Sequence, residues 1–197
     1  MKIKQQKQIK NFIIEEFNEE KLFQKQEELL KSLIENIKNK SENQIKTLVQ
    51  TILPRIALYK TFLNNGYSPD ISYEYMRKYM INKVAIKKNA SMKKMELIPG
   101  FYALYSKIFL NIMRKTDIMR KTDLQENTQK HDKNCFDVTI SKCLWHTACV
   151  ECECPELCKL FCDVDNITYN NLKKIGFTRT KTLGYDGDCC DFHFFKK

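Results

Sequence analysis

Most of the residues that could do chemistry gather in the last third of this 197-residue chain. The stretch from Cys143 to Phe194 holds eight of the nine cysteines, the only tryptophan and two of the three histidines. No secretory leader is visible at the start of the chain, so we expect a cytoplasmic protein. In that compartment cysteines serve as thiols, metal ligands or catalytic groups rather than as a disulfide framework.

The cysteine spacing does not match a familiar metal motif. Cys149 and Cys152 form one CxxC pair, but the second well-separated pair of a structural zinc site is missing, and no iron–sulfur spacing fits. Cys154, Cys158 and Cys162 follow at four-residue steps, which places them on one helix face, where small thiols commonly pack inward. The sequence therefore favours thiols without a metal or another cofactor, and leaves a bound metal as an alternative.

A reactive thiol needs a lowered pKa, which a nearby cation, a base or a helix N-terminus can supply. Arg179, His146 and His193 are the candidates closest in sequence. His193 stands between two phenylalanines in a predicted strand, where a lone histidine is more often structural. His146 follows the tryptophan at a predicted strand end, and neither histidine carries a strong signal.

Three carboxylates accompany the cysteine segments. Glu156 would lie in the first turn of a helix, where a carboxylate simply favours the helix dipole. The helix is predicted over 156–163, and Asp165 follows its end beside the same cysteine-bearing segment. Asp191 stands in an otherwise apolar strand, and if it faces the core it needs a partner such as Arg179. Arg179 also offers the planar fork that binds a substrate carboxylate.

The residues that precede this stretch predict a helical framework. Apolar residues recur at three- and four-residue steps over 9–38, and a capping box at Ser41 starts a second helix. Pro54 is expected to kink that helix. Further helices are predicted from Ser68 to about Lys87 and from Phe101 to about Met113.

The residue composition and pattern change after residue 113. Residues 114–134 are polar, and the hexapeptide IMRKTD occurs twice in tandem over 112–123, so we expect a surface linker. Beyond it, apolar and polar residues alternate over 136–144 and over 177–183, which predicts strands. The apolar run 190–195 is expected to pair with the second of these as an antiparallel hairpin.

The predicted fold is therefore α+β, with N-terminal helices followed by a small antiparallel sheet and an embedded helix. We divide the chain into a helical region, 1–113, which packs on the C-terminal part, a linker, 114–134, and a cysteine-rich region, 135–197, which carries the candidate site. The long amphipathic N-terminal part could cover the sheet or pair with a second subunit, so a homo-oligomer stays open.

The net charge of +10 lies entirely in residues 1–134, because residues 135–197 carry 8 Lys and Arg against 9 Asp and Glu. Because lysines alternate there with many glutamates, we interpret the charge as solvated helix surface rather than a nucleic-acid site. The most apolar run, 97–113, is too short to span a bilayer and is interrupted by polar and helix-breaking residues. We expect no nucleic-acid partner and no membrane, which favours a small molecule as the ligand.

The runs PELCKLFCDVD, FTRTKTL and CDFHF, in this order, resemble the C-terminal signature of the L-2-amino-thiazoline-4-carboxylic acid hydrolase family. The preceding helices resemble the family only in layout. The matching positions are Cys143, Pro155, Glu156, Leu157, Cys162, Asp165, Phe177, Arg179, Thr180, Thr182, Leu183, Gly187, Cys190, Asp191 and Phe192. The resemblance implies a hydrolase that opens a cyclic amidine-type ring, such as 2-amino-thiazoline-4-carboxylate, at a C–N or C–S bond to give a carbamoyl-cysteine.

The ring carbon bonded to two nitrogens and a sulfur is electrophilic when the ring is protonated. A thiolate could attack it, or a carboxylate could activate water. On this resemblance the nucleophile is one of two cysteines and the acid or base one of two aspartates; the catalytic candidates are Cys162, Cys190, Asp165 and Asp191. The residues expected to bind substrate, with the arginine on its carboxylate and the threonines as donors, are Arg179, Thr180, Thr182 and Glu156.

A second interpretation is a non-catalytic, cysteine-rich sensor that binds a small ligand or a metal, related in layout to 4-vinyl-reductase-type domains. This analogy rests on the fold alone, and a fold does not fix a function. The cysteines outside the family pattern favour the sensor, namely Cys149, Cys152, Cys154 and Cys189. The arginine, threonine and aspartate set favours the enzyme, and product accumulating beyond one per chain would separate the two.

Overall fold

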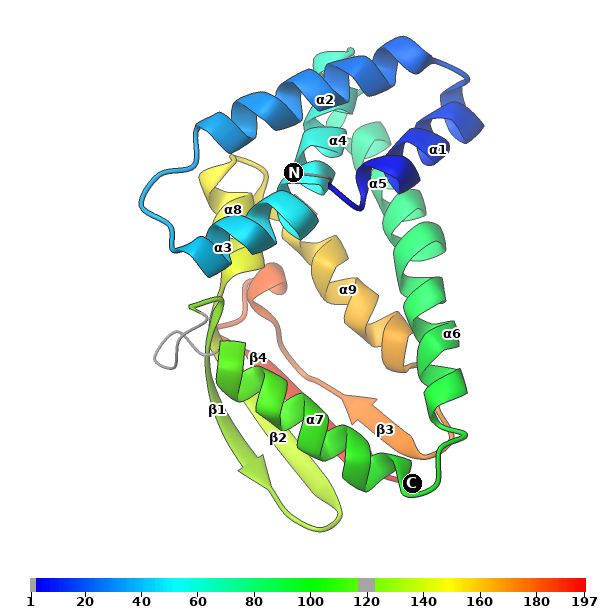
Figure 1. Ribbon diagram of the computed structural model, residues 1–197, viewed down its shortest axis with the longest axis vertical. Coiled ribbons are helices and arrows are strands. Elements are labelled where there is room, and N and C mark those ends of the chain that lie inside the picture. Colours follow the sequence, from blue (N-terminus) through cyan, green and yellow to red (C-terminus); the bar gives the residue numbers. More distant parts are fainter. Residues whose placement is uncertain (1–2, 117–122) are drawn as a thin grey trace.

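The computed structural model describes residues 3–116 and 123–197 (Figure 1). Helices make up the first part, and a four-stranded antiparallel sheet with two further helices makes up the second, so the α+β class is confirmed. The helices are α1 (Gln6–Phe17), α2 (Glu20–Glu35), α3 (Glu42–Thr47), α4 (Leu53–Asn64), α5 (Pro69–Tyr79), α6 (Ile86–Met95), α7 (Phe101–Thr116), α8 (Leu144–Glu151) and α9 (Cys158–Tyr169). The strands are β1 (Gln125–His131), β2 (Cys135–Cys143), β3 (Ile175–Thr178) and β4 (Cys190–Lys196).

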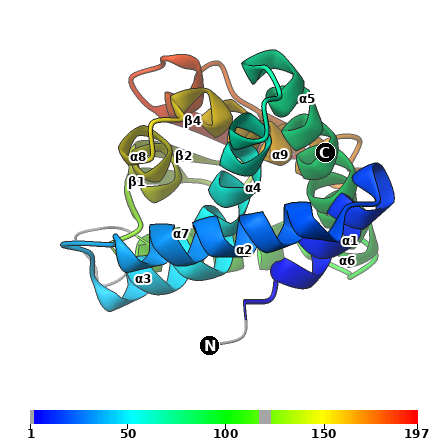
Figure 2. The same cartoon turned by 90° about the horizontal axis from the view of Figure 1, so that it is seen from above.

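The first predicted helix is two helices in the structure. Asn18 adopts a left-handed conformation with φ of 50° and ends α1, and α2 begins two residues later. Asparagine tolerates this conformation better than most residues, so the break needs no glycine. Seen from above, α2 crosses the top of the helical part over α4 (Figure 2).

The second helix begins as predicted. The Ser41 side chain accepts a hydrogen bond from the backbone of Gln44, and the Gln44 side chain accepts one from the backbone of Ser41. A π-helical turn, Leu48–Ile52, directly precedes Pro54. Such a wider turn accommodates the irregularity that proline introduces, because proline has no backbone N–H to donate.

The predicted third helix begins at Ser68, whose side chain caps α5 through the Ile71 backbone. A second π-helical turn, Met80–Ala85, then joins α5 to α6, so the helical run continues to Met95. No helix within the described residues is both long and apolar enough to cross a membrane.

The sheet has the order β1-β2-β4-β3, and all neighbouring pairs are antiparallel. The predicted strand over 136–144 corresponds to β2, and the predicted hairpin pairs β3 with β4. The strand predicted over 177–183 ends at Thr178, because an irregular loop over 179–189 follows it. We call residues 179–189 the covering loop, since it packs against α9.

Residues 114–134, which we expected to form a linker, contain the end of α7 and the whole of β1. Strand β1 is an edge strand of polar sequence, QENTQKH, and it pairs only with β2. Its side chains show no alternation of apolar and polar residues, so no pattern indicated a strand there. Within the tandem hexapeptide, residues 117–122 lie outside the described residues.

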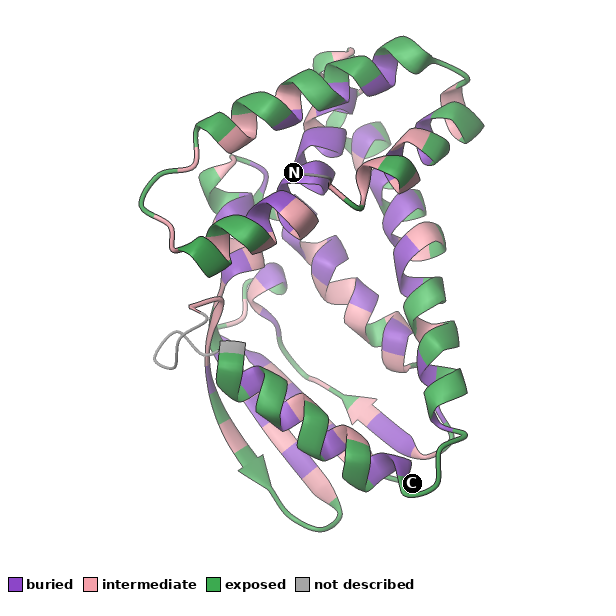
Figure 3. Cartoon of the chain, viewed as in Figure 1, coloured by how far each residue is buried: buried purple, intermediate pink, exposed green. Residues whose placement is uncertain are grey.

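The sheet is covered on one face and open on the other. Phe136, Phe192 and Phe194 point inward. Phe136 and Phe194 pack against Phe109 of α7, and Phe194 also packs against Tyr169 of α9. The stripe of buried residues along β2 and β4 alternates with half-buried ones (Figure 3). Because neighbouring residues of a strand face opposite sides, this alternation decides which β4 residues can reach the interior.

Candidate active site

Cys162 lies in the second turn of α9, where several donors converge on its sulfur. The Thr182 hydroxyl donates a hydrogen bond to Cys162 Sγ at 3.0 Å, and the Cys158 and Cys190 thiols also donate to it. The bonds from Cys158, Cys190 and Thr182, together with the charge of Arg179, lower the pKa of the Cys162 thiol despite its burial. These are the conditions that hold a cysteine as a nucleophilic thiolate.

Further buried cysteines extend this arrangement. Cys149 of α8 lies within hydrogen-bond reach of Cys154 and Cys158, Cys158 lies within reach of Cys162 one helical turn later, and Cys190 of β4 reaches Cys162 from the sheet. The hydrogen bond to Cys162 and burial raise the pKa of Cys190. We call Cys149, Cys158, Cys162 and Cys190 the thiol chain, in which neutral thiols surround one thiolate.

Arg179 connects the covering loop to the same point of α9. Its Nη2 donates a hydrogen bond to the Cys162 carbonyl oxygen at 2.9 Å, and its Cζ lies 6.0 Å from the centre of the Phe192 ring. Its Nη1 is buried and finds no hydrogen-bond partner among the described residues. Such an unsatisfied donor is costly unless a ligand completes its bonding, and a guanidinium suits a carboxylate.

Asp165 lies three residues after Cys162 on α9, a spacing that brings side chains to neighbouring positions on a helix surface. Burial raises its pKa to about 6, and the positive charges of Lys88 and Arg179 offset part of this effect. The Asp165 carboxylate makes no hydrogen bond within the part of the chain that the structure describes. It is therefore a half-buried carboxyl group that changes charge near neutral pH.

Asp191 faces away from Cys162 and organises the covering loop instead. Its Oδ1 accepts hydrogen bonds from the backbone N–H groups of Thr180 at 2.9 Å and Lys181 at 2.8 Å, and its Oδ2 accepts one from the Thr180 hydroxyl. Burial opposes the ionisation of Asp191, but these hydrogen bonds outweigh it and lower the pKa. Since Cys190 points inward, the adjacent Asp191 must point outward.

Glu156 lies at the other end of this region. It belongs to a 3-10 turn, Pro155–Leu157, that leads into α9, and its carboxylate accepts a hydrogen bond from the Tyr59 hydroxyl at 2.6 Å. Burial and this hydrogen bond raise the pKa of Tyr59. Among the described residues Glu156 bonds to Tyr59 and to neither Cys162 nor Arg179, so it joins α4 to the start of α9.

The covering loop approaches Cys162 more closely than a side chain would permit. A Cβ atom at Gly184 would lie 2.8 Å from Cys162 Sγ and 3.1 Å from the Cys158 carbonyl oxygen. The Gly184 N–H donates to Thr182 Oγ1, which fixes the hydroxyl that in turn donates to Cys162. On the outer side, the Tyr185 hydroxyl lies 3.0 and 2.9 Å from the two Asp163 carboxylate oxygens.

Of the predicted site residues, the structure brings Cys162, Cys190, Thr182 and Arg179 together, with Asp165 beside them on α9. Asp191 and Thr180 hold the covering loop, and Glu156 lies apart. The sequence interpretation did not single out Gly184, Tyr185 or the Cys158 contact. Gly184 stands two residues after Thr182, which matches the family signature, and a glycine there indicates a close backbone approach. No feature of the sequence pointed to Tyr185.

His193 does not join this site. The His193 ring lies on the open face of the sheet, with its Nδ1 2.6 Å from Asp137 Oδ1 on β2, its cross-strand neighbour. Nor do the residues in 3–116 and 123–197 include a group of three or more His, Cys, Asp or Glu side chains arranged to hold a metal ion. The chemistry that the arrangement offers is therefore thiolate and carboxylate chemistry beside a guanidinium.

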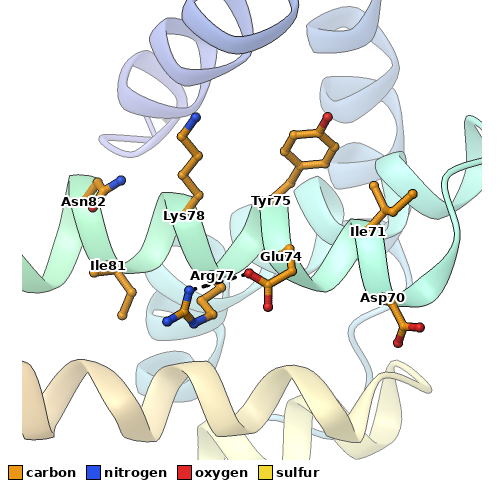
Figure 4. Close-up of a pocket in the computed structure, with 8 residues that line it drawn as sticks. All are labelled: Asp70, Ile71, Glu74, Tyr75, Arg77, Lys78, Ile81 and Asn82. Atoms are coloured by element: carbon orange, nitrogen blue, oxygen red, sulfur yellow. Dashed lines mark ion pairs between the residues drawn. The ribbon is translucent and has the colours of Figure 1, made fainter.

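The pocket of about 510 Å³ in Figure 4 lies elsewhere, on the surface of α5. An ion pair of 3.5 Å between Arg77 and Glu74 lies on its wall. Its lining residues are Asp70, Ile71, Glu74, Tyr75, Arg77, Lys78, Ile81 and Asn82, none of which belongs to the predicted site. We therefore place the candidate active site at Cys162 from its chemistry and not from this hollow.

Comparison with known proteins identifies a family. No curated protein matches this chain significantly. The family model of L-2-amino-thiazoline-4-carboxylic acid hydrolase, however, matches residues 42–194. That range covers more than three quarters of the chain and contains Cys162, Asp165, Arg179 and Cys190, whereas α1 and α2 lie before it. The chain therefore belongs to the L-2-amino-thiazoline-4-carboxylic acid hydrolase family.

Proposed function

We propose that this hydrolase opens the ring of a 2-amino-thiazoline-4-carboxylate with Cys162 as the nucleophile, and releases N-carbamoyl-cysteine. Family membership supports a hydrolase. The observation that carries the finer proposal is the pairing of two features at one point of α9. Cys162 Sγ is held by the Thr182 hydroxyl at 3.0 Å. Arg179, whose Nη2 bonds to the Cys162 carbonyl oxygen, has a buried Nη1 with no partner among the described residues.

The reaction would proceed in two stages. With the ring protonated on nitrogen, the Cys162 thiolate attacks the ring carbon that carries two nitrogens, and the bond between that carbon and the ring sulfur breaks. The ring sulfur leaves as the thiolate of the product. Because a carbamoyl-cysteine keeps both nitrogens on this carbon, the C–S bond and not a C–N bond must break. A covalent isothiourea on Cys162 then remains.

Water completes the reaction in the second stage. It adds to the carbon of the isothiourea, and Cys162 leaves as a thiolate while the carbon becomes the carbonyl of a urea. Asp165 is the group that we assign to take the proton from this water. With a pKa raised to about 6 by burial, Asp165 is mostly a carboxylate at neutral pH yet basic enough to serve. The net change is the addition of one water to the ring.

Arg179 would bind the substrate carboxylate through the unpartnered Nη1. Its Nη2 is already committed to the Cys162 carbonyl oxygen, so the guanidinium holds the substrate at a fixed distance from the nucleophile. Thr182 stabilises the thiolate rather than the substrate in this scheme. Thr180 and Asp191 position Arg179 by fixing the turn that follows it, and we assign no proton transfer to Asp191.

The test is product formation by purified variants, measured as N-carbamoyl-cysteine by mass spectrometry over time. Cys162→Ala should lower kcat/KM by about 10³-fold or more, as expected for loss of a nucleophile. Arg179→Lys should mainly raise KM, by about ten-fold, because lysine lacks the planar fork. Cys135→Ala is the matched control, since Cys135 begins β2 and contacts Asp132 rather than the thiol chain.

Two results would overturn the proposal. Full activity in Cys162→Ala would remove Cys162 as the nucleophile. Product that never exceeds one equivalent per chain, with substrate still bound, would instead indicate a non-catalytic binding protein. Cys190→Ala separates the roles further, because it should retain measurable turnover if Cys190 only donates a hydrogen bond to Cys162.

A further inference from the structure

The thiol chain contains more sulfur than ring opening requires. Hydrolysis uses one thiolate, yet a second thiol, Cys190, lies beside Cys162 on a different element of the fold. Thr182 Oγ1 lies 3.0 Å from Cys162 Sγ, and the backbone N of the next residue, Leu183, lies 3.4 Å from Cys190 Sγ. Both are free thiols in this structure. A thiolate with an adjacent neutral thiol is the arrangement in which one sulfur is oxidised and the other resolves the product.

We propose that Cys162 and Cys190 are a redox pair, which a hydroperoxide converts into a reversible disulfide between α9 and β4. In the first step the Cys162 thiolate attacks one peroxide oxygen and the O–O bond breaks. The sulfur becomes a sulfenic acid, and hydroxide (or alkoxide) leaves and takes up a proton. Sulfur loses two electrons in this step and the peroxide gains them.

In the second step Cys190 attacks the oxidised sulfur. The Cys190 sulfur forms the S–S bond, the S–O bond of the sulfenic acid breaks, and the Cys190 proton leaves with the hydroxyl group as water. The Leu183 backbone N–H points at Cys190 Sγ from 3.4 Å and stabilises charge on that sulfur as its proton departs. A dithiol reductant reverses the process by thiol–disulfide exchange.

Geometry favours Cys190 over Cys158 as the resolving thiol. Cys158 and Cys162 stand one turn apart on the same helix, where their Cα–Cβ bonds point in nearly the same direction. A disulfide needs a dihedral angle of about 90° about its S–S bond, so closing this pair would distort α9. Cys190 instead approaches from β4, directly after the covering loop, whose backbone can adjust.

Disulfide formation does not depend on the proposed function, but its consequence does. If Cys162 opens the ring, closing the disulfide removes the nucleophile and stops hydrolysis until a reductant restores it. The protein would then work only in a reducing environment. The pair therefore makes a redox-controlled site from residues that the hydrolysis alone would not require.

The sequence allows a direct test by tryptic mapping. Trypsin cleaves after Lys159 and Lys173, so the peptide 160–173 carries Cys162 as its only cysteine. The peptide 182–196 carries Cys189 and Cys190, and the peptide 143–159 carries Cys158 with four other cysteines. Cross-links between any two of these three peptides therefore differ in mass.

The full chain is reduced, freed of reductant, treated with one equivalent of hydrogen peroxide, and blocked with an alkylating reagent. We expect the protein to lose the mass of two hydrogen atoms and peptide 160–173 to become linked to 182–196. The matched variants are Cys189→Ala, which should keep this link, and Cys190→Ala, which should lose it. Dithiothreitol should remove the link from the wild-type protein.

A link from 160–173 to 143–159 in the wild-type protein, or a Cys162 that stops at sulfenic or sulfinic acid, would overturn the proposal. So would a link that survives in Cys190→Ala. Activity is measured on the same samples. A disulfide in a protein whose reduced form never opens the ring would support the redox pair and count only against the proposed function.

Discussion

Two parts of this molecule cover a neighbouring helix by opposite means. Helices α1 and α2 cover α4 and α5 mainly with buried apolar side chains such as Phe12, which is 1% exposed and packs against Tyr79. The covering loop is held on α9 by polar bonds to Cys162 and by the close approach of Gly184. The first contact depends on apolar volume, and the second depends on individual atoms.

This difference coincides with the extent of the family match. Residues 42–194 include the covering loop and α9, but exclude α1 and α2. An apolar cover can be built from many sequences as long as volume and pattern are kept. A contact made by one hydroxyl, one guanidinium and one glycine tolerates few changes, and this is the part that carries the chemistry.

The largest effect on stability should follow from breaking the apolar cover. Phe12→Ala should lower the free energy of unfolding by about 3–5 kcal/mol, because it leaves a cavity beside Tyr79. The remaining folded protein should keep its ring-opening rate, since the ring of Phe12 packs against Tyr79 of α5 rather than against the covering loop. Chemical denaturation measures the first effect and activity per folded molecule the second. If activity per folded molecule falls in Phe12→Ala but not in Phe12→Leu, the apolar cover and the site at Cys162 are coupled.

Disturbing the covering loop should instead reduce activity more than stability. Gly184→Ala places a methyl group 2.8 Å from Cys162 Sγ, so the loop or the sulfur must move. We expect a loss of about 1–3 kcal/mol in stability together with a larger loss of activity. Tyr185→Phe is the control, because it removes the hydroxyl contact with Asp163 at the same loop but leaves the Gly184 spacing intact. Unchanged kinetics in Gly184→Ala would contradict the proposed placement of the site.

The next prediction concerns the pH dependence of stability at Asp165. Asp165 has a pKa raised to about 6 in the folded protein, so the folded state binds its proton more tightly than the unfolded state does. Its cost to stability is therefore absent below about pH 4, grows as the pH rises from 4 to 6, and stays constant above that range. Because the group is partly exposed, Asp165→Asn should stabilise the protein by roughly 1–2 kcal/mol at pH 8 and by almost nothing at pH 4.

The same residue predicts the activity profile. If Asp165 acts as the base, the ring-opening rate of the wild-type protein should rise with pH through about 6 as the carboxyl group loses its proton. Thermal unfolding and kinetics at matched pH values check both statements. A stabilised Asp165→Asn variant with an undiminished rate would remove Asp165 from catalysis and leave its titration a purely structural property.

The smallest effect is expected from the charges at the rim of the apolar cover. Lys78 of α5 pairs with Glu16 of α1 at 2.5 Å, and both side chains are partly exposed. An ion pair of this kind contributes about 0–1 kcal/mol and is screened by salt. Lys78→Ala should therefore change the denaturation midpoint little at low salt and not at all at high salt. A loss comparable with that of Phe12→Ala would show that charge, and not apolar burial, holds α1 in place.

Local features of the fold were readable from the sequence because their causes are local. The Ser41 capping box, the Ser68 cap and the alternation over β2 each rest on side chains within a few residues of one another. Strand β1 was missed because it is a polar edge strand that is defined only by its pairing with β2. The break at Asn18 was missed because apolar spacing continues through it while the backbone turns.

The candidate site residues likewise depend on contacts that local sequence does not specify. Strand parity at Cys190 and Asp191 was available from the sequence, and it already implied that only one of them could face α9. The sequence could not tell which one, because either side of β4 could have been the covered face. It also gave no means to see that Glu156 would bond to Tyr59, which is 97 residues away.

The sequence by itself determined the elements, the family signature and the set of groups available for chemistry, since these depend on residue type and short-range spacing. The tertiary structure alone decided that Thr182, Cys158, Cys190 and Arg179 act on one sulfur and that Asp191 does not. Those contacts join α9, β4 and the covering loop across long stretches of chain, and they arise only when the sheet and helices pack. The pKa of Cys162 is a consequence of that packing, so no local pattern could contain it.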